Sequence, residues 1–317
     1  MLTVIIPVKN GESTLGCCFT AILQQSLSEK IEILVLDSGS TDNSILIANS
    51  FGARVIEIDP QSFNHGTTRN LGAQLAIGSL LYYTVQDAEL SDMTHLANMS
   101  AHFQDQEVQA VVGIQGYPKH LDKNPALWFN RFTKPEVEIR QYKENSFSKS
   151  SENEQFELSN WDNVNAMYRK SALLAIPFRK VDYCEDWLWA NDSLKQGLKI
   201  LRDPKLLTYH YHHLTFGYVF KSKFIINYHF FKHFNQQPHI QFTFIPFLRK
   251  VYTLLNRSEV KWINKPYWIL HNLFAHFSNF SSILFFKIIL FLGGTIFLDK
   301  IYLLLSKRVP QGFLKKN

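Results

Sequence analysis

Two carboxylates stand side by side among aromatic residues in the segment 183–189, where Glu185 and Asp186 open a helical pattern. Burial in such a setting raises the pKa of a carboxyl group and suits it to accept a proton as a general base. Acidic residues also occur at helix N-termini for structural reasons, because the helix dipole favours them there. The pair is a candidate catalytic site, with helix stabilisation as the alternative.

A further carboxylate, Asp87, follows the apolar run 80–85 almost directly. Carboxylate oxygens at the end of a strand can hold a hard divalent cation. The segment 209–213 offers imidazoles, among them His210 and His212, and imidazole suits manganese better than magnesium. The hypothesis is a Mn²⁺ or Mg²⁺ site of Asp87 with His210 and His212. The alternative is a strand at 209–213 whose polar side chains alternate outward.

The segment 63–72 has the composition of an anion site. Gly66 begins a helix whose unpaired N–H groups attract negative charge, and Arg69 lies one turn further on. The planar guanidinium group matches the oxygens of a diphosphate. Seen alone, Arg69 is equally compatible with an ordinary surface position.

Asp37 ends the second apolar run of the chain, and residues 38–40 are Ser-Gly-Ser. In a doubly wound sheet an acid at this place meets a ribose or base. The small residues after it permit a tight turn into the next helix. Asp37 is thus a candidate nucleotide ligand, with capping of that turn as the alternative.

A repeating strand and helix pattern in the first 115 residues positions these side chains. Apolar runs typical of buried parallel strands cover 2–8, 31–36, 53–58, 80–85 and 108–114, and helical patterns cover 13–25, 42–51, 67–77 and 92–103. Farther on we expect a mobile loop at 143–157 and a helix at 184–196, after which the segment 199–201 leads to Asp203 and Pro204. The pattern predicts an α/β fold with a Rossmann-like, mostly parallel sheet and helices on both faces.

The C-terminal third differs in charge and composition. From Arg202 onward there are 16 Lys and Arg against three acids, whereas the whole chain has a net charge of +6. The stretch 266–298 is apolar and aromatic with one charged residue, Lys287, and its longest uninterrupted apolar run, 288–298, is about half of the ~20 residues that a spanning helix needs. Helices lying on an anionic membrane surface fit this pattern, with a soluble helical subdomain and a spanning segment as alternatives.

Cysteine usage and the N-terminus bear on the compartment. The three cysteines, Cys17, Cys18 and Cys184, lack the spacing of a zinc site or a disulfide framework, which favours a reducing compartment. The first residues lack the basic and apolar regions of a signal peptide. We expect a cytoplasmic location and no nucleic-acid partner.

The four motifs, taken in order, resemble the inverting glycosyltransferase family 2, which has the GT-A fold, over residues 1–217. Within it the sequence is most similar to the bacterial rhamnosyltransferase group. The resemblance is carried by the segments 63–72, 86–88 and 159–170, by Glu185 with Asp186, and by His210 with His212.

The resemblance implies a role for each motif residue. The nucleotide base and ribose would be lined by Pro7, Val8 and Asp37, the diphosphate would be faced by Arg69, and its metal would be held by Asp87 with His210 or His212. Asp186 would deprotonate the acceptor, with Glu185 supporting it. Residues 1–217 would form the catalytic domain, with a nucleotide half at 1–115 and an acceptor half at 116–217, and residues 218–317 a helical membrane-associating region.

The implied reaction moves rhamnose or another deoxyhexose from a dTDP- or UDP-linked donor to a lipid-linked glycan. It would serve bacterial cell-surface polysaccharide synthesis, such as that of O-antigen, at the cytoplasmic face of the membrane. The sequence departs from the family pattern at Val85, which stands where a first acid is usual. This departure weakens the metal site and favours, as an alternative, a non-catalytic nucleotide-sugar-binding module. A transferase of UDP-hexose and a nucleotidyltransferase on a similar sheet are further alternatives.

Overall fold

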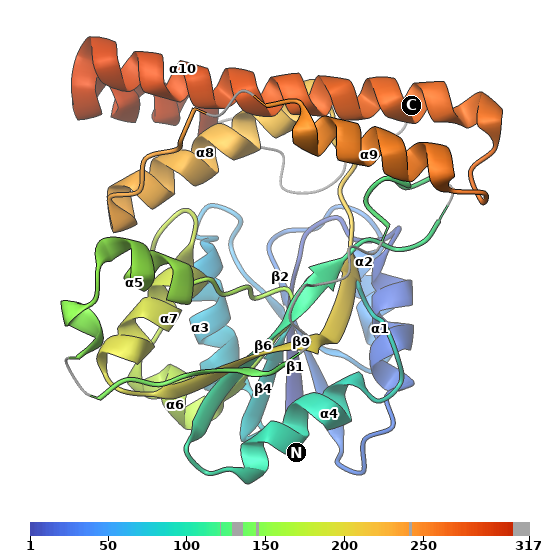
Figure 1. Ribbon diagram of the computed structural model, residues 1–317. Coiled ribbons are helices and arrows are strands. Elements are labelled where there is room, and N and C mark those ends of the chain that lie inside the picture. Colours follow the sequence, from blue (N-terminus) through green and yellow to red (C-terminus); the bar gives the residue numbers. More distant parts are fainter. Residues whose placement is uncertain (121, 129–135, 144–145, 241–242, 307–317) are drawn as a thin grey trace. The chain divides into compact units, whose positions relative to one another are not determined.

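The computed structural model describes residues 1–306 except 121, 129–135, 144–145 and 241–242 (Figure 1). The chain forms two compact units. The N-terminal unit comprises Met1–Gly116 and Arg131–His210, and the C-terminal unit comprises Tyr117–Asn130 and Tyr211–Pro310. The domain boundary predicted at residue 217 falls shortly after this division. Residues 117–130, which the sequence placed in the acceptor half, cluster with the C-terminal helices.

One half of the sheet in the N-terminal unit is parallel, in the order β3-β2-β1-β4. Its strands are β1 (Leu2–Val8), β2 (Ile31–Asp37), β3 (Arg54–Glu57) and β4 (Leu80–Tyr83). β1 and β2 are buried along nearly their whole length, as strands covered on both faces must be. The strands predicted from the apolar runs are confirmed here.

The other half of the sheet continues from β4 in the order β8-β6-β9-β5, with β7 also paired to β9. These strands are β5 (Ala88–Leu90), β6 (Val108–Gly116), β7 (Glu138–Arg140), β8 (Ala166–Arg169) and β9 (Lys199–His210). β8 runs antiparallel to both β4 and β6, and β5 and β7 run antiparallel to β9. The sheet is therefore more mixed than the sequence predicted, because three of these strands are too short to give an apolar run.

Helices cover both faces of this sheet, as predicted (Figure 1). They are α1 (Leu15–Leu23), α2 (Ser44–Ser50), α3 (His65–Leu75), α4 (His95–Ala101), α5 (Glu152–Leu158), α6 (Lys170–Ala175) and α7 (Glu185–Lys195). The helices α1, α2 and α4 pack on the face to which β1 contributes Val4 and Ile6, and α3, α6 and α7 pack on the face of Ile5. The alternation of β1 side chains thus divides the core into two layers.

The segment 143–157 is not the loop that the sequence predicted. It contains a short 3₁₀ turn at Phe147–Lys149 and the greater part of α5. The side chain of Ser151 accepts a hydrogen bond from the backbone N–H of Glu154 and so caps the helix. The polar, charged composition led to the prediction of a loop, whereas the segment contains a capped helix with no buried residue.

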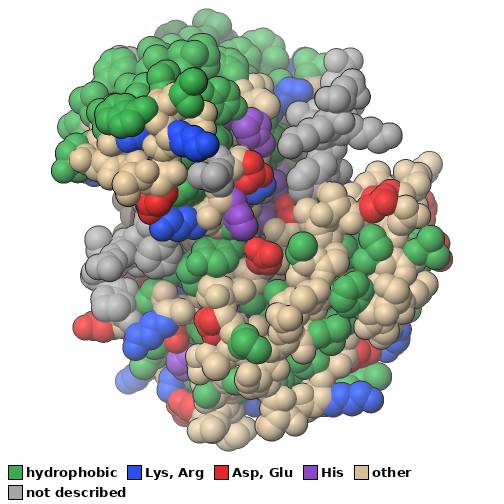
Figure 2. Space-filling view, turned by 90° about the vertical axis from the view of Figure 1, so that its right-hand side faces the viewer, with side chains coloured by type: hydrophobic (Ala, Val, Ile, Leu, Met, Phe, Trp, Pro, Cys, Tyr) green, Lys and Arg blue, Asp and Glu red, His purple; other side chains and the backbone are tan. Residues whose placement is uncertain are grey.

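The C-terminal unit consists mainly of α8 (Phe216–Phe234), α9 (Ile245–Asn256) and α10 (Lys265–Ser306). α10 is two helices joined at Gly294, whose φ of 60° and ψ of −157° only glycine adopts readily. Phe224 and Tyr228 of α8 pack with side chains from both sides of this kink, including Phe286 and Tyr302. Much of the outer surface remains apolar, and Figure 2 shows hydrophobic side chains massed over this unit.

Within the helix Trp262–Ser306 the most apolar window of 18 residues has a mean hydropathy of 2.1, and 22% of that window is buried. By length and composition alone it could cross a membrane. The sequence analysis expected no apolar segment long enough to span a membrane, and this expectation is wrong for the helix as a whole. The polar residues that interrupt the apolar run in the sequence do not interrupt the helix.

Candidate active site

The loops after β1, β2 and β4 meet at the carboxyl edge of the parallel half of the sheet. The backbone N–H of Lys9 donates to the side-chain oxygen of Gln86 at 2.8 Å, which ties the first loop to the third. Asn10 adopts a left-handed conformation with φ of 51° and accepts a hydrogen bond from the backbone N–H of Thr41 at 2.8 Å, which ties it to the second. The three loops that follow β1, β2 and β4 are thus neighbours at this edge of the sheet.

Asp37 is fully buried at the end of β2. Its Oδ2 accepts hydrogen bonds from the backbone N–H groups of Gly39 and Ser40, both at 2.9 Å, and its Oδ1 accepts one from the Ser40 hydroxyl. Gly39 has φ of 82°, and a Cβ there would lie 2.4 Å from Pro60. The geometry therefore shows the capping role that the sequence left as the alternative, and a contact to the nucleotide stays a prediction.

Pro7 and Val8 occupy the last positions of β1. The Val8 side chain is buried in the core, so only its backbone could line a nucleotide site. That backbone carbonyl accepts from the Ser38 N–H at 2.9 Å. Pro7 is partly exposed, and its predicted contact to the base stays a prediction.

The segment 63–72 leads into α3 and includes most of that helix, and two of its asparagines hold the chain that leads to α7. Asn64 and Asn70 donate from their side-chain amides to backbone carbonyl oxygens of segment 178–181, at 2.7 and 2.8 Å. A Cβ on Gly66 would lie 2.2 Å from another carbonyl oxygen of the same segment. The motif thus places the N-terminus of α7, a role that the sequence did not indicate.

Arg69 forms an ion pair with Glu185, the first residue of α7. Both side chains are nearly buried, with 6% and 7% of their surface exposed. The backbone carbonyl of Arg69 also accepts a hydrogen bond from the Tyr83 hydroxyl at 2.8 Å. The pair neutralises two charges that would be costly to bury separately. Arg69 therefore contacts the candidate catalytic pair, and its role toward a diphosphate stays a prediction.

Asp186 follows Glu185 at a sharp entry to α7, where Cys184 has φ of 63°. Its carboxylate accepts hydrogen bonds from the backbone N–H groups of Asn163 at 3.2 Å and Trp187 at 2.9 Å. Burial raises the pKa of Asp186 well above its usual range, and the charges of Glu185 and Asp162 raise it further, while Arg69 opposes them. A carboxylate with a raised pKa is a stronger base, as proton abstraction from a hydroxyl requires.

Asp87 and His210 are brought together because β5 pairs with β9, with Ala88 opposite His210. The His210 Nε2 lies 3.4 Å from the Asp87 Oδ1, and both side chains are about nine-tenths buried. β9 begins at Lys199 and ends at His210. His212 belongs to the C-terminal unit, where its ring lies 5.9 Å from that of Tyr218. Its share in a metal site stays a prediction.

Gln115, near the end of β6, links His210 to Asp162, and the sequence analysis missed it. The side-chain nitrogen of Gln115 donates to the Asp162 carboxylate, which can only accept. Its oxygen therefore faces the His210 Nδ1 at 2.8 Å, and that nitrogen must carry a proton. In neutral His210 the Nε2 lone pair then faces the Asp87 carboxylate. Two facing acceptors are the arrangement that a cation between them stabilises.

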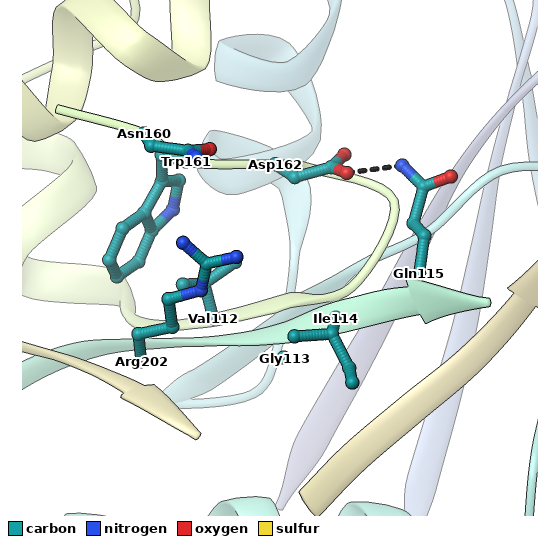
Figure 3. Close-up of a pocket in the computed structure, with 8 residues that line it drawn as sticks. All are labelled: Val112, Gly113, Ile114, Gln115, Asn160, Trp161, Asp162 and Arg202. Atoms are coloured by element: carbon teal, nitrogen blue, oxygen red, sulfur yellow. Dashed lines mark hydrogen bonds between the residues drawn. The ribbon is translucent and has the colours of Figure 1, made fainter. Parts of the chain in front are cut away.

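A cavity of about 200 Å³ lies next to these residues, on the α7 face of the sheet (Figure 3). Its walls come from β6, from β9 and from the segment before β8, and the lining residues are Val112, Gly113, Ile114, Gln115, Asn160, Trp161, Asp162 and Arg202. Figure 3 shows the Arg202 guanidinium extending from β9 toward Asn160 and Trp161, and the hydrogen bond between Gln115 and Asp162. No feature of the sequence signalled this cavity.

Residues 3–177 match the model of the family described as glycosyl transferase family 2. The chain belongs to this family. It is 30% identical over 223 residues to the O-antigen chain rhamnosyltransferase RfbN of Salmonella typhimurium, which covers 68% of this chain and 67% of that protein. It is 32% identical over 124 residues to the O-antigen chain rhamnosyltransferase WbaN of Salmonella anatum, 39% of each chain. The glycosyltransferase class predicted from the motifs is confirmed.

Solved structures confirm the GT-A-type fold. The mannosyltransferase PcManGT of Pyrobaculum calidifontis, in complex with GDP-Man and Mn²⁺, superimposes with a TM-score of 0.55 at 16% identity, over 96% of this chain and 84% of that one. Staphylococcus aureus TarS 1-349, in complex with UDP, gives a TM-score of 0.53 at 13% identity, over 90% and 91%. At these identities the likeness concerns the fold alone.

Proposed function

We propose that this family 2 glycosyltransferase moves rhamnose or another deoxyhexose from a dTDP- or UDP-linked donor to a lipid-linked glycan, with inversion at C1. The names of the Salmonella relatives support the deoxyhexose and the polysaccharide context. The observation that carries the proposal is the carboxylate of Asp186, held by two backbone N–H groups and raised in pKa by its surroundings. This residue lies beyond the region that the family model matches, so its role rests on the site's own geometry.

The chemistry requires one base. As the acceptor oxygen attacks C1 of the donor sugar, its proton passes to the Asp186 carboxylate. The bond between C1 and the diphosphate oxygen breaks on the opposite face, and the nucleoside diphosphate leaves with the electron pair. The carboxylate of Glu185 is engaged in the ion pair with Arg69, and its charge raises the basicity of Asp186.

Asp87 and His210 fit a divalent cation, since a carboxylate oxygen and an imidazole nitrogen converge with little exposed surface. When bound there, the cation would neutralise charge on the departing diphosphate. Gln115 holds the ring of His210 in the orientation that leaves Nε2 toward Asp87, as outer residues of metal sites commonly do. His212 is kept as a further ligand of this proposed site.

We further propose that the C-terminal unit docks the enzyme on the cytoplasmic face of an anionic membrane. Large apolar side chains are strongly exposed there, Trp262 by 73%, Ile263 by 84% and Phe291 by 89%. The same third of the chain carries the excess of Lys and Arg. Apolar insertion and attraction to anionic lipids act together in peripheral binding.

The full chain incubated with dTDP-rhamnose, UDP-glucose or UDP-rhamnose, together with lipid extracts that carry acceptor glycans, tests the reaction. The expected result is transfer from a deoxyhexose donor and release of the nucleoside diphosphate. Release of inorganic diphosphate would indicate the nucleotidyltransferase that the sequence left open. Transfer from UDP-glucose alone would refute the deoxyhexose assignment.

A further inference from the structure

Arg202 is the residue of the cavity beside Asp162 for which the fold supplies no partner. Within the described ranges, its guanidinium makes no hydrogen bond or ion pair, although the side chain is half-buried. Burial lowers the pKa of Arg202, and the charge of Arg140 lowers it further, against Glu138 and Asp162. A guanidinium carries five N–H donors and no acceptor, so donors without a protein partner are met by water or by a ligand in the cavity. The donors are placed to meet ligand oxygens.

Arg140 on β7 provides the contrast. It is 3% exposed, pairs with both oxygens of Glu138, and donates to the backbone carbonyls of Leu158 and Asn160 at 2.7 and 3.0 Å. These bonds fix the chain that leads into the cavity wall at Asn160 and Asp162. One arginine thus holds the wall, while Arg202 faces the space that the wall encloses (Figure 3).

The charge balance of the cavity points to an uncharged ligand. The Arg202 cation is accompanied by the Asp162 carboxylate, so a further anion would find no net positive charge to neutralise. Asn160 and Gln115 add amide groups that can donate and accept. Planar groups of this kind, one cationic, one anionic and two neutral, suit the adjacent hydroxyls of a sugar. The volume of about 200 Å³ is below the roughly 300–1,000 Å³ of drug-sized sites and fits a single ring.

The cavity also adjoins the candidate base. Asp162 acts electrostatically on Asp186, and the backbone N–H of the next residue, Asn163, donates to the Asp186 carboxylate at 3.2 Å. Through Gln115 the same Asp162 is linked to His210. A ring bound in the cavity would therefore contact the segment that holds the base.

We infer that this cavity is a subsite for one neutral monosaccharide ring, whose hydroxyls are bound by Arg202 and Asp162. The inference deepens the proposed function and rests on it. Two molecules in the proposed reaction carry such a ring, the donor and the acceptor glycan. The shared chemistry is the hydroxylated ring, and the experiment below separates its two sources.

The variants Arg202→Gln and Arg202→Lys test the subsite, because the first removes the charge and the second retains it without the planar fork. Lys205→Gln is the matched control, since it removes a cation from an exposed position of the same strand. Three quantities are measured for each protein: the Kd of the nucleoside diphosphate, the Kd of the nucleotide sugar, and the KM of the acceptor. Circular dichroism verifies that each variant is folded.

If the donor ring occupies the cavity, Arg202→Gln weakens nucleotide-sugar binding by roughly 10- to 100-fold and leaves nucleoside diphosphate binding unchanged. If the acceptor ring occupies it, both donor constants stay unchanged and the acceptor KM rises by a similar factor. Arg202→Lys should show an intermediate loss. Changes below twofold in all three quantities, or equal losses in Lys205→Gln, overturn the subsite.

Saturation-transfer NMR with free rhamnose gives a readout that needs no transfer activity. A signal in the wild-type protein that Arg202→Gln removes supports the subsite even if no donor is turned over, in which case the proposed reaction fails alone. If the wild-type protein gives neither this signal nor a sugar-dependent change in any constant, the subsite is wrong.

Discussion

The two units of the molecule differ in which side chains they bury and which they expose. In the N-terminal unit, the buried carboxylates Asp37 and Glu185 and the partly buried Asp186 all have named donors or a cation beside them. In the C-terminal unit, rings such as Tyr252 and Phe291 remain 71% and 89% exposed. Buried charge is tolerated only with a partner, and exposed apolar surface of this extent marks an interaction site. The first unit therefore keeps its buried charges paired, and the second exposes large apolar side chains.

The largest expected effect concerns Asp186. Asp186→Asn keeps the shape of the side chain and removes the base, so kcat should fall by about 10²–10⁴-fold while donor affinity stays near that of the wild type. Single-turnover assays and equilibrium donor binding measure the two quantities. Glu185→Gln, which changes the neighbouring carboxylate, is measured in the same assays. Retention of more than a tenth of wild-type turnover in Asp186→Asn would contradict the assignment of Asp186 as the base.

Because the pKa of Asp186 is raised, the pH dependence of kcat should differ between the wild type and Asp186→Asn. The base works when deprotonated, so kcat should increase as pH rises through a pKa well above the ordinary value of about 3.9 for aspartate. The acid limb should be absent from whatever activity remains in Asp186→Asn. An unchanged limb in that variant would assign the titration to another group.

The second effect concerns Asp87 and His210. If they hold a divalent cation, excess EDTA should weaken nucleotide-sugar binding, and Mn²⁺ should restore it in the wild type and not in Asp87→Ala. Isothermal titration with and without Mn²⁺ measures the difference. Asp92→Ala, which removes an exposed carboxylate shortly after β5, is the control. Donor affinity indifferent to EDTA would show a site that works without metal.

The sequence predicted the parallel half of the sheet because its four strands coincide with the apolar runs 2–8, 31–36, 53–58 and 80–85. It could not predict β8 or β7, which have four and three residues, since pairing with distant strands decides such short segments. It also selected Asp186, and Asp87 together with His210, but not the hydrogen bonds by which Gln115 links His210 to Asp162. The sequence analysis did not select Gln115 or Arg202, because a single glutamine or arginine within a strand belongs to no recognisable motif. Their positions in the site follow from the pairing of β6 with β9.

Arg69 illustrates a further limit. Its position in a helical segment suggested an anion ligand, yet its guanidinium is paired with a carboxylate 116 positions away in the sequence. Spacing reveals which side chains share a helix face, but not which distant chain packs on that face. The contact of Arg69 comes from Glu185, the first residue of α7, and its role toward a diphosphate stays a prediction.

A smaller effect is expected at the membrane. The full chain should bind vesicles of anionic lipid more strongly than vesicles of neutral lipid, and salt should weaken this binding because the charges are screened. The double variant Trp262→Ser with Ile263→Ser should bind several-fold more weakly, whereas Leu46→Ser, which exposes as much of its side chain in the N-terminal unit, should not. Sedimentation with vesicles measures binding. A soluble chain under all conditions would refute docking, and extraction only by detergent would indicate a spanning helix.

The smallest effect is a structural one at the kink of α10. Gly294 has φ of 60° and ψ of −157°, a region that an alanine enters at a cost of about 1–3 kcal/mol. Gly294→Ala should therefore loosen the packing of α8 against the two parts of α10, where Tyr228 stacks on Tyr302 with ring centroids 4.0 Å apart. Hydrogen exchange should rise in α8 and α10 and stay unchanged in α3 and α7. Gly217→Ala is the control, because a Cβ there meets nothing within 4 Å and its φ is ordinary. Equal exchange in both variants would mean that the two parts of α10 do not depend on the kink for their packing.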